Sequence, residues 1–228
     1  MSLSERELVG ELMDDPGLDP REHEHALRGL ARLNRLSAAS RPIARALAKK
    51  NAGELLDVAS GSGDVLMGML RRIEVTGAHA CDISAVACAR IEERAHREGK
   101  PVRVFLADAL ATDGLGEAEY DSVMNALFLH HLERNDVVRL LRSMARALRP
   151  GGLLVISDLL RTRLGYAMAL AASRLVTRSR VVHVDALRSV RAAFTMEELR
   201  GIAHEAGLAG VRIERVWPAR ALLVWEKA

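Results

Sequence analysis

The chain has 228 residues, 49% of them hydrophobic and 28% charged, which suits one large domain with a substantial core. Its 33 basic and 30 acidic residues nearly balance, and only 3% are aromatic, so neither charge nor stacking favours nucleic acid. Cys81 and Cys88 form no C-x-x-C pair and no disulfide framework, which favours a reducing compartment. No apolar stretch has the length of a membrane span, and the polar start does not fit a signal peptide, so we expect a cytoplasmic protein.

The first fifty residues are expected to be helical. A short helix is predicted before a break at 14–20, and leucines at helical spacing over 27–36 predict a longer one. Ser40-Arg41-Pro42 suits a further helix start, because proline is tolerated in a first turn. The pattern changes after residue 50, so we expect residues 1–50 and 51–228 to form separate units.

Strands and helices alternate through the middle of the chain. Alternation of this kind predicts parallel strands in one sheet that helices cover on both faces. Strands are predicted at 54–59, 75–81, 102–106, 120–126 and 153–157, and helices from Asp64, whose side chain is expected to cap the helix, over 84–98 and over 134–148.

The last third of the chain has a different pattern. An alanine-rich helix is predicted from 159 to about 180. Thr195 and Glu198 form a capping-box pattern that begins another helix, which ends near Gly207. Residues 211–217 and 221–226 then predict two strands joined through Pro218, an antiparallel hairpin.

The most informative segment lies where the first predicted strand ends. Leu55–Ala59 is a nearly continuous apolar run, which indicates a strand that is buried on both faces. Gly61 and Gly63 follow, and they allow a sharp turn that a ligand can approach closely. A dinucleotide fingerprint would need a third glycine where Leu66 stands, and no Gly-Lys-Ser/Thr sequence of a phosphate-binding loop occurs.

The segment Asp57-Val58-Ala59-Ser60-Gly61-Ser62-Gly63-Asp64 resembles the first motif of class I S-adenosylmethionine (AdoMet) dependent methyltransferases. It is most similar to the D-V-A-x-G-T-G-D form of the ubiquinone and menaquinone biosynthesis methyltransferases. The resemblance covers about residues 50–228. It implies AdoMet as cofactor and an α/β, Rossmann-like, mostly parallel seven-stranded sheet of order 3-2-1-4-5-7-6, with the last strand antiparallel and helices on both faces.

The resemblance also implies roles for polar groups at the strand ends. Asp82 is expected to accept hydrogen bonds from the ribose hydroxyls; the alternative is a helix cap, which Ser84 also suits. Asp108 is expected at the adenine amino group, with a solvated loop acid as the alternative. The expected cofactor contacts are Asp57, Ala59, Ser60, Gly61, Gly63, Asp82, Ile83, Asp108, Ala109, Asn125 and His130.

The run Leu127–Leu132 follows the fourth predicted strand, where this family presents the methyl group. His130 is the first candidate for a base and His131 the second, because histidine titrates near neutral pH. The alternative is that these histidines only hold the loop. No further Cys, His or acid stands at ligand spacing nearby, so no metal is expected.

We expect the acceptor site to be covered by residues 1–50 and by a helical lid at about 159–194. Tyr166, Phe194 and Arg161 are the candidates for contact with the acceptor. The alternative is an ordinary packed helix whose arginines extend to solvent.

The expected function is methyl transfer to a small, largely apolar metabolite of phenolic or polyketide-like type, by O-methylation, as in secondary metabolism. C-methylation of a quinone precursor is one alternative, and an NAD(P)-dependent oxidoreductase with a degenerate glycine loop is another. We expect a small-molecule substrate, no nucleic acid and no integral membrane segment, in a monomer or homodimer. Asn125-Ala126-Leu127-Phe128 lacks the prolines of the Asn-Pro-Pro-Tyr loop typical of nucleic-acid methylation.

Overall fold

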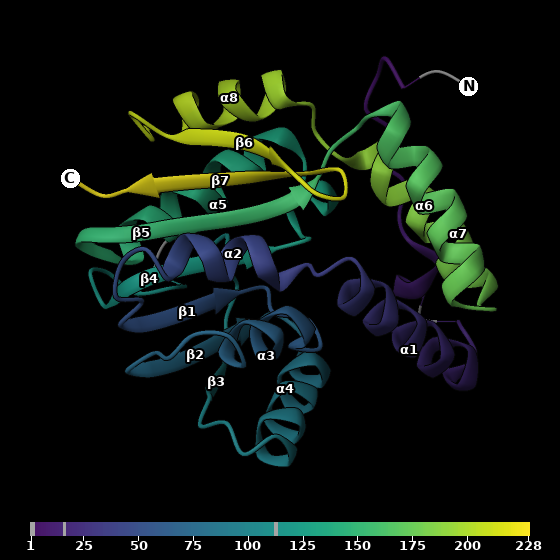
Figure 1. Cartoon of the computed structure of the whole chain (residues 1–228), viewed down its shortest axis with the longest axis horizontal. Helices are drawn as coiled ribbons and strands as arrows, with labels where there is room; N and C mark the ends of the chain where they lie inside the picture. Colours follow the sequence, from purple (N-terminus) through teal and green to yellow (C-terminus); the bar gives the residue numbers. More distant parts are fainter. Residues whose placement is uncertain (1–2, 16, 112–113) are drawn as a thin grey trace.

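Seven strands form one sheet in the order β3-β2-β1-β4-β5-β7-β6 in the computed structural model, which describes residues 3–15, 17–111 and 114–228 (Figure 1). The strands are β1 (Glu54–Val58), β2 (Gly77–Asp82), β3 (Arg103–Leu106), β4 (Tyr120–Ala126), β5 (Leu148–Leu159), β6 (Arg212–Val216) and β7 (Arg220–Glu226). β1 to β5 pair in parallel, and β7 runs antiparallel to both β5 and β6. The predicted fold class and sheet order are confirmed.

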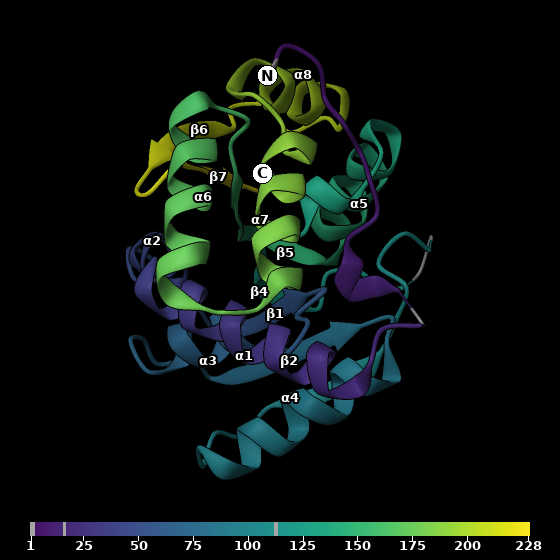
Figure 2. The ribbon, with the colours of Figure 1, turned by 90° about the vertical axis from the view of Figure 1, so that its right-hand side faces the viewer.

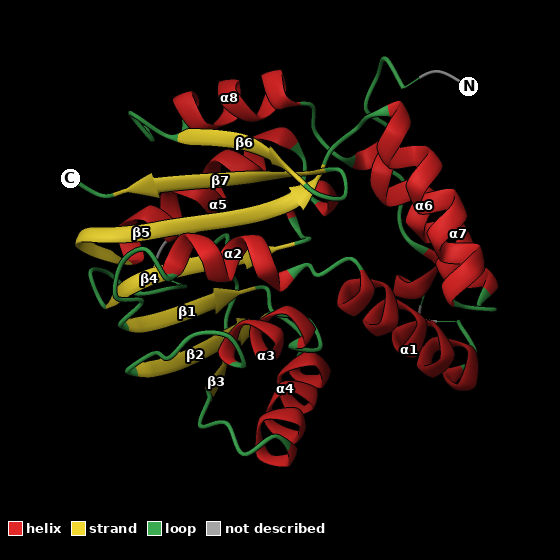
Figure 3. Cartoon of the chain, viewed as in Figure 1, coloured by secondary structure: helices red, strands yellow, loops and turns green. Residues whose placement is uncertain are grey.

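Helices cover both faces of this sheet (Figure 3). The helices are η1 (Leu12–Asp14), α1 (Pro20–Leu36), α2 (Ser40–Leu47), α3 (Asp64–Leu70), α4 (Ala85–Arg97), η2 (Leu129–His131), α5 (Arg134–Ala147), α6 (Arg163–Val176), α7 (Arg180–Ala192) and α8 (Met196–Glu205). One buried cluster includes Leu140 of α5 and Ile202 of α8, and the other includes Ile43 of α2 and Leu66 of α3. The two clusters lie on opposite faces of the central strands, because neighbouring strand residues such as Val123 and Met124 belong to different clusters.

Three helices lie apart from these two layers. α1, α6 and α7 stand together beyond the carboxyl ends of β1, β4 and β5 (Figures 1 and 2). α6 and α7 pack against each other, and α1 contacts both. These helices therefore cover the sheet edge at which parallel α/β folds bind their ligands. Among the described helices, none is both long and apolar enough to cross a bilayer.

Four local expectations are corrected. The short helix predicted before residue 14 is only the single turn of η1. The helix predicted over 159–180 is the shorter α6, and α7, which follows it, was not predicted. β5 begins at Leu148, so the Pro150-Gly151-Gly152 stretch lies inside a strand, next to a register shift opposite Tyr120. Asp64 does not cap α3, because Gly63 occupies the N-cap position with φ +70°; the Asp64 carboxylate instead pairs with Arg94.

Candidate active site

The glycine turn after β1 leaves open space above it. Ala59, Gly61 and Gly63 all have positive φ angles, of +53°, +56° and +70°. Two backbone hydrogen bonds stabilise the turn. The Ser60 N–H donates to the Cys81 carbonyl at 3.1 Å, and the Gly63 N–H donates to the Ser60 carbonyl at 2.9 Å. A Cβ atom on Gly61 would meet no protein atom within 4 Å, whereas one on Gly63 would touch Ile91. The contact with Ile91 would be an ordinary one, so the positive φ is what favours glycine at position 63, while the space at Gly61 is open.

Asp82 bridges this turn and the next helix. One carboxylate oxygen, Oδ2, accepts from the Gly61 N–H and the other from the Ser84 N–H, each at 2.9 Å. Ser84 is the true cap of α4, because its hydroxyl accepts from the Ala87 N–H at 3.3 Å. Each Asp82 oxygen has a further lone pair for a ligand hydroxyl. Next to it, the apolar side chain of Ile83 is 70% exposed.

Asp108 follows β3 and lies at the same sheet edge. Its side chain is exposed, and Oδ1 accepts from the Leu110 N–H at 2.8 Å in a local turn. Ala109, directly after it, is buried. The carboxyl ends of β1, β2 and β3 thus present, in succession, a glycine turn, a carboxylate with an apolar neighbour, and a second carboxylate.

Two buried polar side chains lie where β1 meets β4. Asn125 donates through Nδ2 to the Val58 carbonyl at 2.7 Å, while its Oδ1 atom is buried without a hydrogen-bond partner among the described residues. Burial raises the pKa of Asp57 to about 7, and the nearby charge of Asp82 adds to the shift. An unpaired acceptor and a carboxyl group poised between its two charge states fit an ammonium group of a ligand.

A cavity of about 440 Å³ opens from the glycine turn to the helices that cover it. Its walls are mostly apolar, and its polar groups come from six segments of the chain. The lining includes Glu11, Leu30, Leu33, Ser37, residues 59–62, Ala126, Leu127, His130, His131, Leu159, Met168, Ala172, Val176, Val182, Asp185, Val190, and residues 217–220. A nearly apolar chamber next to a polar nucleoside groove is suited to a small, largely apolar molecule.

His130 and Asp158 form a buried pair in the floor of this cavity. Nδ1 of His130 lies 2.6 Å from Oδ1 of Asp158, and the two residues are 4% and 3% exposed. Asp158 also accepts from the Phe128, Leu129 and Leu159 N–H groups, which fix it in place. Burial lowers the pKa of His130, but the charge and hydrogen bond of Asp158 outweigh this effect and the pKa is raised overall. Because Nδ1 is committed to Asp158, Nε2 is the nitrogen available for proton transfer.

Glu11 is a site residue that the sequence did not reveal. Ligand-capable atoms of Glu11, His130 and His131 lie within 4.8 Å of one another, so an acid does stand beside the two histidines. Glu11 also accepts from the Ser189 hydroxyl, and burial raises the pKa of its carboxyl group. The pKa of His131 is lowered to about 4 by desolvation and by the adjacent His130. These three side chains are the described residues able to hold a metal ion at this cavity.

The two imidazole rings lie close together and are tilted. Their centroids lie 4.2 Å apart and their planes differ by 35°. A close pair of tilted rings does not by itself direct the nitrogen lone pairs to one point, as joint ligands of one small ion require. The absence of a metal stays a prediction.

The three side chains expected at the acceptor do not line the cavity. Arg161 is buried in an ion pair with Glu198, at 2.7 Å, and donates to the Ala193 carbonyl. Phe194 is 3% exposed in the core, with the Arg6 guanidinium 4.0 Å from its ring centroid. Tyr166 contacts Arg191 through its hydroxyl and its ring. The polar groups of Arg161 and Tyr166 are used in contacts with α7, α8 and the segment between them, which sequence position alone could not show.

The comparisons with known proteins agree with this geometry. Residues 55–152 match the family described as a methyltransferase domain. The fold is similar to that of a SAM-dependent methyltransferase from Aquifex aeolicus, with 17% identity, a TM-score of 0.64, and coverage of 92% of this chain and 100% of the other. It is also similar to the plantazolicin methyltransferase BpumL, solved in complex with a triazolic desmethylPZN analog and SAH, with 14% identity, a TM-score of 0.70 and 92% coverage of both chains.

A third similar structure is longer. It is a candidate O-methyltransferase from Nostoc punctiforme, 17% identical with a TM-score of 0.64; the match covers 89% of this chain and 60% of the other. This chain therefore spans less than two thirds of that protein's length.

The sheet order is the one expected for AdoMet-dependent methyltransferases, and residues 55–152 match a methyltransferase domain. The predictions of a methyltransferase domain and of AdoMet as its cofactor are confirmed. The similarity to the ubiquinone and menaquinone group, and the roles of the individual site residues, stay predictions.

Proposed function

We propose that this protein transfers a methyl group from AdoMet to a hydroxyl group of a small, largely apolar acceptor held in the 440 Å³ cavity. The observation that supports this best is the buried His130–Asp158 pair at the cavity floor, next to the glycine turn. AdoMet supplies an electrophilic methyl group on a sulfonium, and the space at Gly61 and the unpaired Asn125 Oδ1 fit such a ligand.

In this proposal the cofactor lies across the carboxyl ends of β1, β2 and β3. The expected contacts keep the roles that the resemblance implies. Asp82 accepts from the ribose hydroxyls, Ile83 covers the adenine ring, and Asp108 and the Ala109 amide serve the adenine edge. Asp57, Ala59 and Asn125 surround the ammonium group, while Ser60 and the amides of Gly61 and Gly63 meet the carboxylate. Residues 1–50 and 159–194 act as the cover of the acceptor site.

The protein's contribution to the chemistry is alignment and removal of one proton. Nε2 of neutral His130 would accept the acceptor's O–H proton. AdoMet, held at the glycine turn, would supply the methyl group to the acceptor oxygen and leave as a neutral thioether. Asp158 holds the ring in one orientation and stabilises the imidazolium that forms, as the acid does in a Ser-His-Asp triad. Exclusion of water by the apolar walls keeps the two reactants in line, and alignment can supply several kcal/mol of the barrier, about 7–11 at best.

Phenolic and polyketide-like hydroxyls are the favoured acceptors, because a phenol's O–H is acidic enough for an imidazole to deprotonate during the reaction. C-methylation of a quinone precursor is the second candidate. The motif after β1 favours it, and an acidic carbon would use the same His130–Asp158 pair.

Two measurements test the proposal. Calorimetry with AdoMet, SAH and NADPH should show tight binding of the first two only; binding of NADPH without any response to AdoMet would discard it. Radiolabelled AdoMet offered with a panel of phenols should then give organic-soluble labelled product. A chain that binds AdoMet but labels no phenol, while labelling a quinone precursor at carbon, would favour the second candidate.

A further inference from the structure

Arg220 is a buried arginine with two guanidinium nitrogens that the described residues leave without a hydrogen-bond partner. It begins β7 and is 5% exposed. Its Nη2 atom donates to the Ser37 hydroxyl at 2.9 Å, while Nε and Nη1 are buried with no hydrogen-bond partner in the described structure. Burial lowers the pKa of Arg220 to about 10, so the guanidinium is still charged at neutral pH. A buried charge of this kind is costly unless a counter-charge meets it.

The nearest candidates for a counter-charge already have partners. Asp158 is the acid that Arg220 senses electrostatically, but its two oxygens accept from His130 Nδ1 and from three backbone N–H groups. Asp185 accepts from the Leu12 and Met13 N–H groups, and Glu11 accepts from Ser189. None of these three acids hydrogen-bonds to Arg220 in the described structure, so an acceptor for its Nε and Nη1 donors has to come from outside the described residues.

Arg220 faces the acceptor side of the cavity. It lines the same chamber as His130, together with the segment 217–219 that precedes it. It pairs with Leu159, at the end of β5, where Figure 1 shows β7 beginning beside the covering helices. Three strand spacings separate β1 from β7 in the sheet order, which amounts to roughly 14 Å. That separation places Arg220 well away from the strand ends that receive the nucleoside, and so favours the acceptor over the cofactor.

We propose that Arg220 binds a carboxylate, or a similar anionic group, of the methyl acceptor, so that the substrate is an apolar acid. The inference rests on the proposed function, because it assumes that the cavity receives the acceptor. The Ser37 hydroxyl holds one guanidinium nitrogen, and the two donors left without a partner meet the anion. The apolar walls of α1, α6 and α7 contact the rest of the molecule, and the group to be methylated lies toward His130.

The test uses matched acids and amides as probes of the SAH-loaded protein. The pairs are 4-hydroxybenzoate with 4-hydroxybenzamide, 3-phenylpropanoate with its amide, and octanoate with octanamide. The wild-type protein should bind the acid of at least one pair about ten- to a hundred-fold more tightly than the amide, the range of one charged hydrogen bond. Arg220→Met should lose that preference, Arg220→Lys should keep part of it, and SAH affinity should stay unchanged in both variants.

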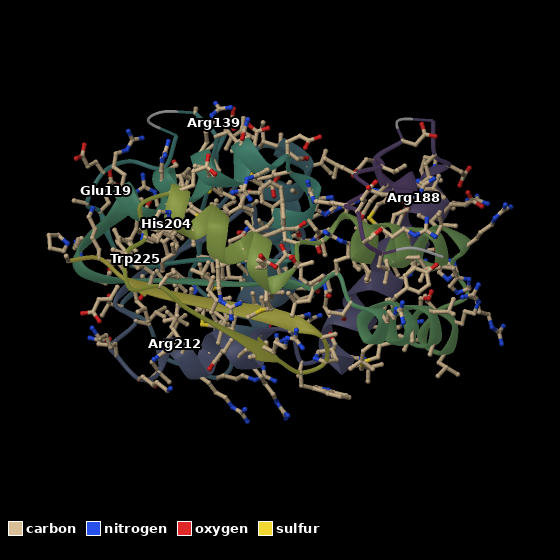
Figure 4. All side chains as sticks on the ribbon, turned by 90° about the horizontal axis from the view of Figure 1, so that it is seen from above. Glu119, Arg139, Arg188, His204, Arg212 and Trp225 are labelled. Carbon is tan, nitrogen blue, oxygen red and sulfur yellow. The ribbon has the colours of Figure 1, made fainter. Side chains whose placement is uncertain are left out.

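Arg212→Met on β6 is the matched control, because Arg212 is exposed and lies at the other end of the molecule from Arg188 of the lid (Figure 4). A wild-type protein that prefers no acid, or an Arg220→Met variant that keeps the preference, overturns the proposal. A loss of SAH affinity in Arg220→Met assigns the anion to the cofactor and overturns it as well. Failure of wild type to bind SAH would instead reject the proposed function itself.

Thermal unfolding without ligand separates a binding role from a structural one. If Arg220 awaits an external anion, Arg220→Met should have a melting temperature equal to or above that of the wild type, because a buried uncompensated charge is removed. Added acid should then raise the melting temperature of the wild type only. A strongly lowered melting temperature of Arg220→Met, with no acid-induced shift in the wild type, would show that the arginine serves the fold.

Discussion

Nδ1 of His130 lies 2.6 Å from Oδ1 of Asp158, and neither side chain has more than 4% of its surface exposed. His130 stands in the η2 turn after β4, and Asp158 lies near the end of β5, so the pair joins two neighbouring strand ends. A histidine oriented by a carboxylate and facing a closed cavity is a general-base arrangement.

His130→Gln should lower turnover about 10²–10⁴-fold, the usual contribution of a positioned base. SAH affinity should remain near normal, because the expected cofactor contacts of the glycine turn are untouched. The measurement is the initial rate of label transfer to the best phenolic acceptor, together with calorimetry for SAH. His204→Gln, at an exposed position on α8 (Figure 4), is the matched control. An unchanged rate in His130→Gln would remove this residue as the base.

The pH dependence of the rate should follow His130. A base must be neutral to accept a proton, and the pKa of His130 is raised, so the rate should rise with pH to above the ordinary histidine range. Asp158→Asn removes the charge that raises this pKa, so the rising limb should move to lower pH while the maximal rate falls. A profile that does not move would contradict the proposed electrostatic role of Asp158.

His130 and Asp158 contribute to the folding stability of the protein over different pH ranges. His130 has a raised pKa in the folded state, so its contribution is full below about pH 6.5 and is lost as pH rises through the higher value. Asp158 has a lowered pKa, so its contribution is present above about pH 3.9 and is lost as pH falls. Melting temperatures measured between these limits should therefore show the largest difference between wild type and Asp158→Asn.

Asp82→Asn should weaken AdoMet binding by roughly 1.5–3 kcal/mol, because a charged acceptor of the ribose hydroxyls is replaced by a neutral amide. The variant also loses the charge that holds the Gly61 and Ser84 N–H groups, so its melting temperature must be measured alongside. Asp136→Asn, in a surface pair on α5, is the control. Equal AdoMet affinity in wild type and Asp82→Asn would argue that the carboxylate serves only the turn.

Ala59→Gly should be tolerated and should raise the free energy of unfolding by up to about 1 kcal/mol. Ala59 has a φ of +53°, in the left-handed region that favours glycine. Ala80→Gly in β2 is the control, because that residue lies in an extended strand and the same change should cost about 0.5–1 kcal/mol there. Denaturant unfolding compares the two. A loss of equal size in both variants would show that the turn at Ala59 carries no strain.

The sequence predicted the sheet well, because buried parallel strands such as Leu55–Ala59 have a dense apolar pattern and glycine turns mark their ends. Tyr120–Ala126 was predicted with the bounds observed for β4. The capping-box pattern also predicted the start of α8 correctly, because Thr195 and Glu198 form both hydrogen bonds of the box.

The cover of the site was predicted less well, since it depends on contacts between distant segments. Tyr166, Phe194 and Arg161 lie in the segment expected to cover the acceptor. In the folded protein, however, their side chains contact other parts of the protein instead of the cavity. Glu11 and Arg220 lie outside any motif, and only the folded chain brings them to His130. A signal for Arg220 existed in the sequence, as a charge at the start of an otherwise apolar strand.

Arg6 donates to the carbonyl groups of His130, Leu132 and Ala192, and Leu12 and Met13 bind Asp185, so the opening segment of the chain is tied to parts made much later. During synthesis on a ribosome, residues 6–13 emerge first and must wait for residues 130–192 before any of these bonds can form. The chamber therefore cannot be completed before α6 and α7 have been made, and until then a nascent chain has no enclosed space in which a reactive sulfonium could meet an acceptor.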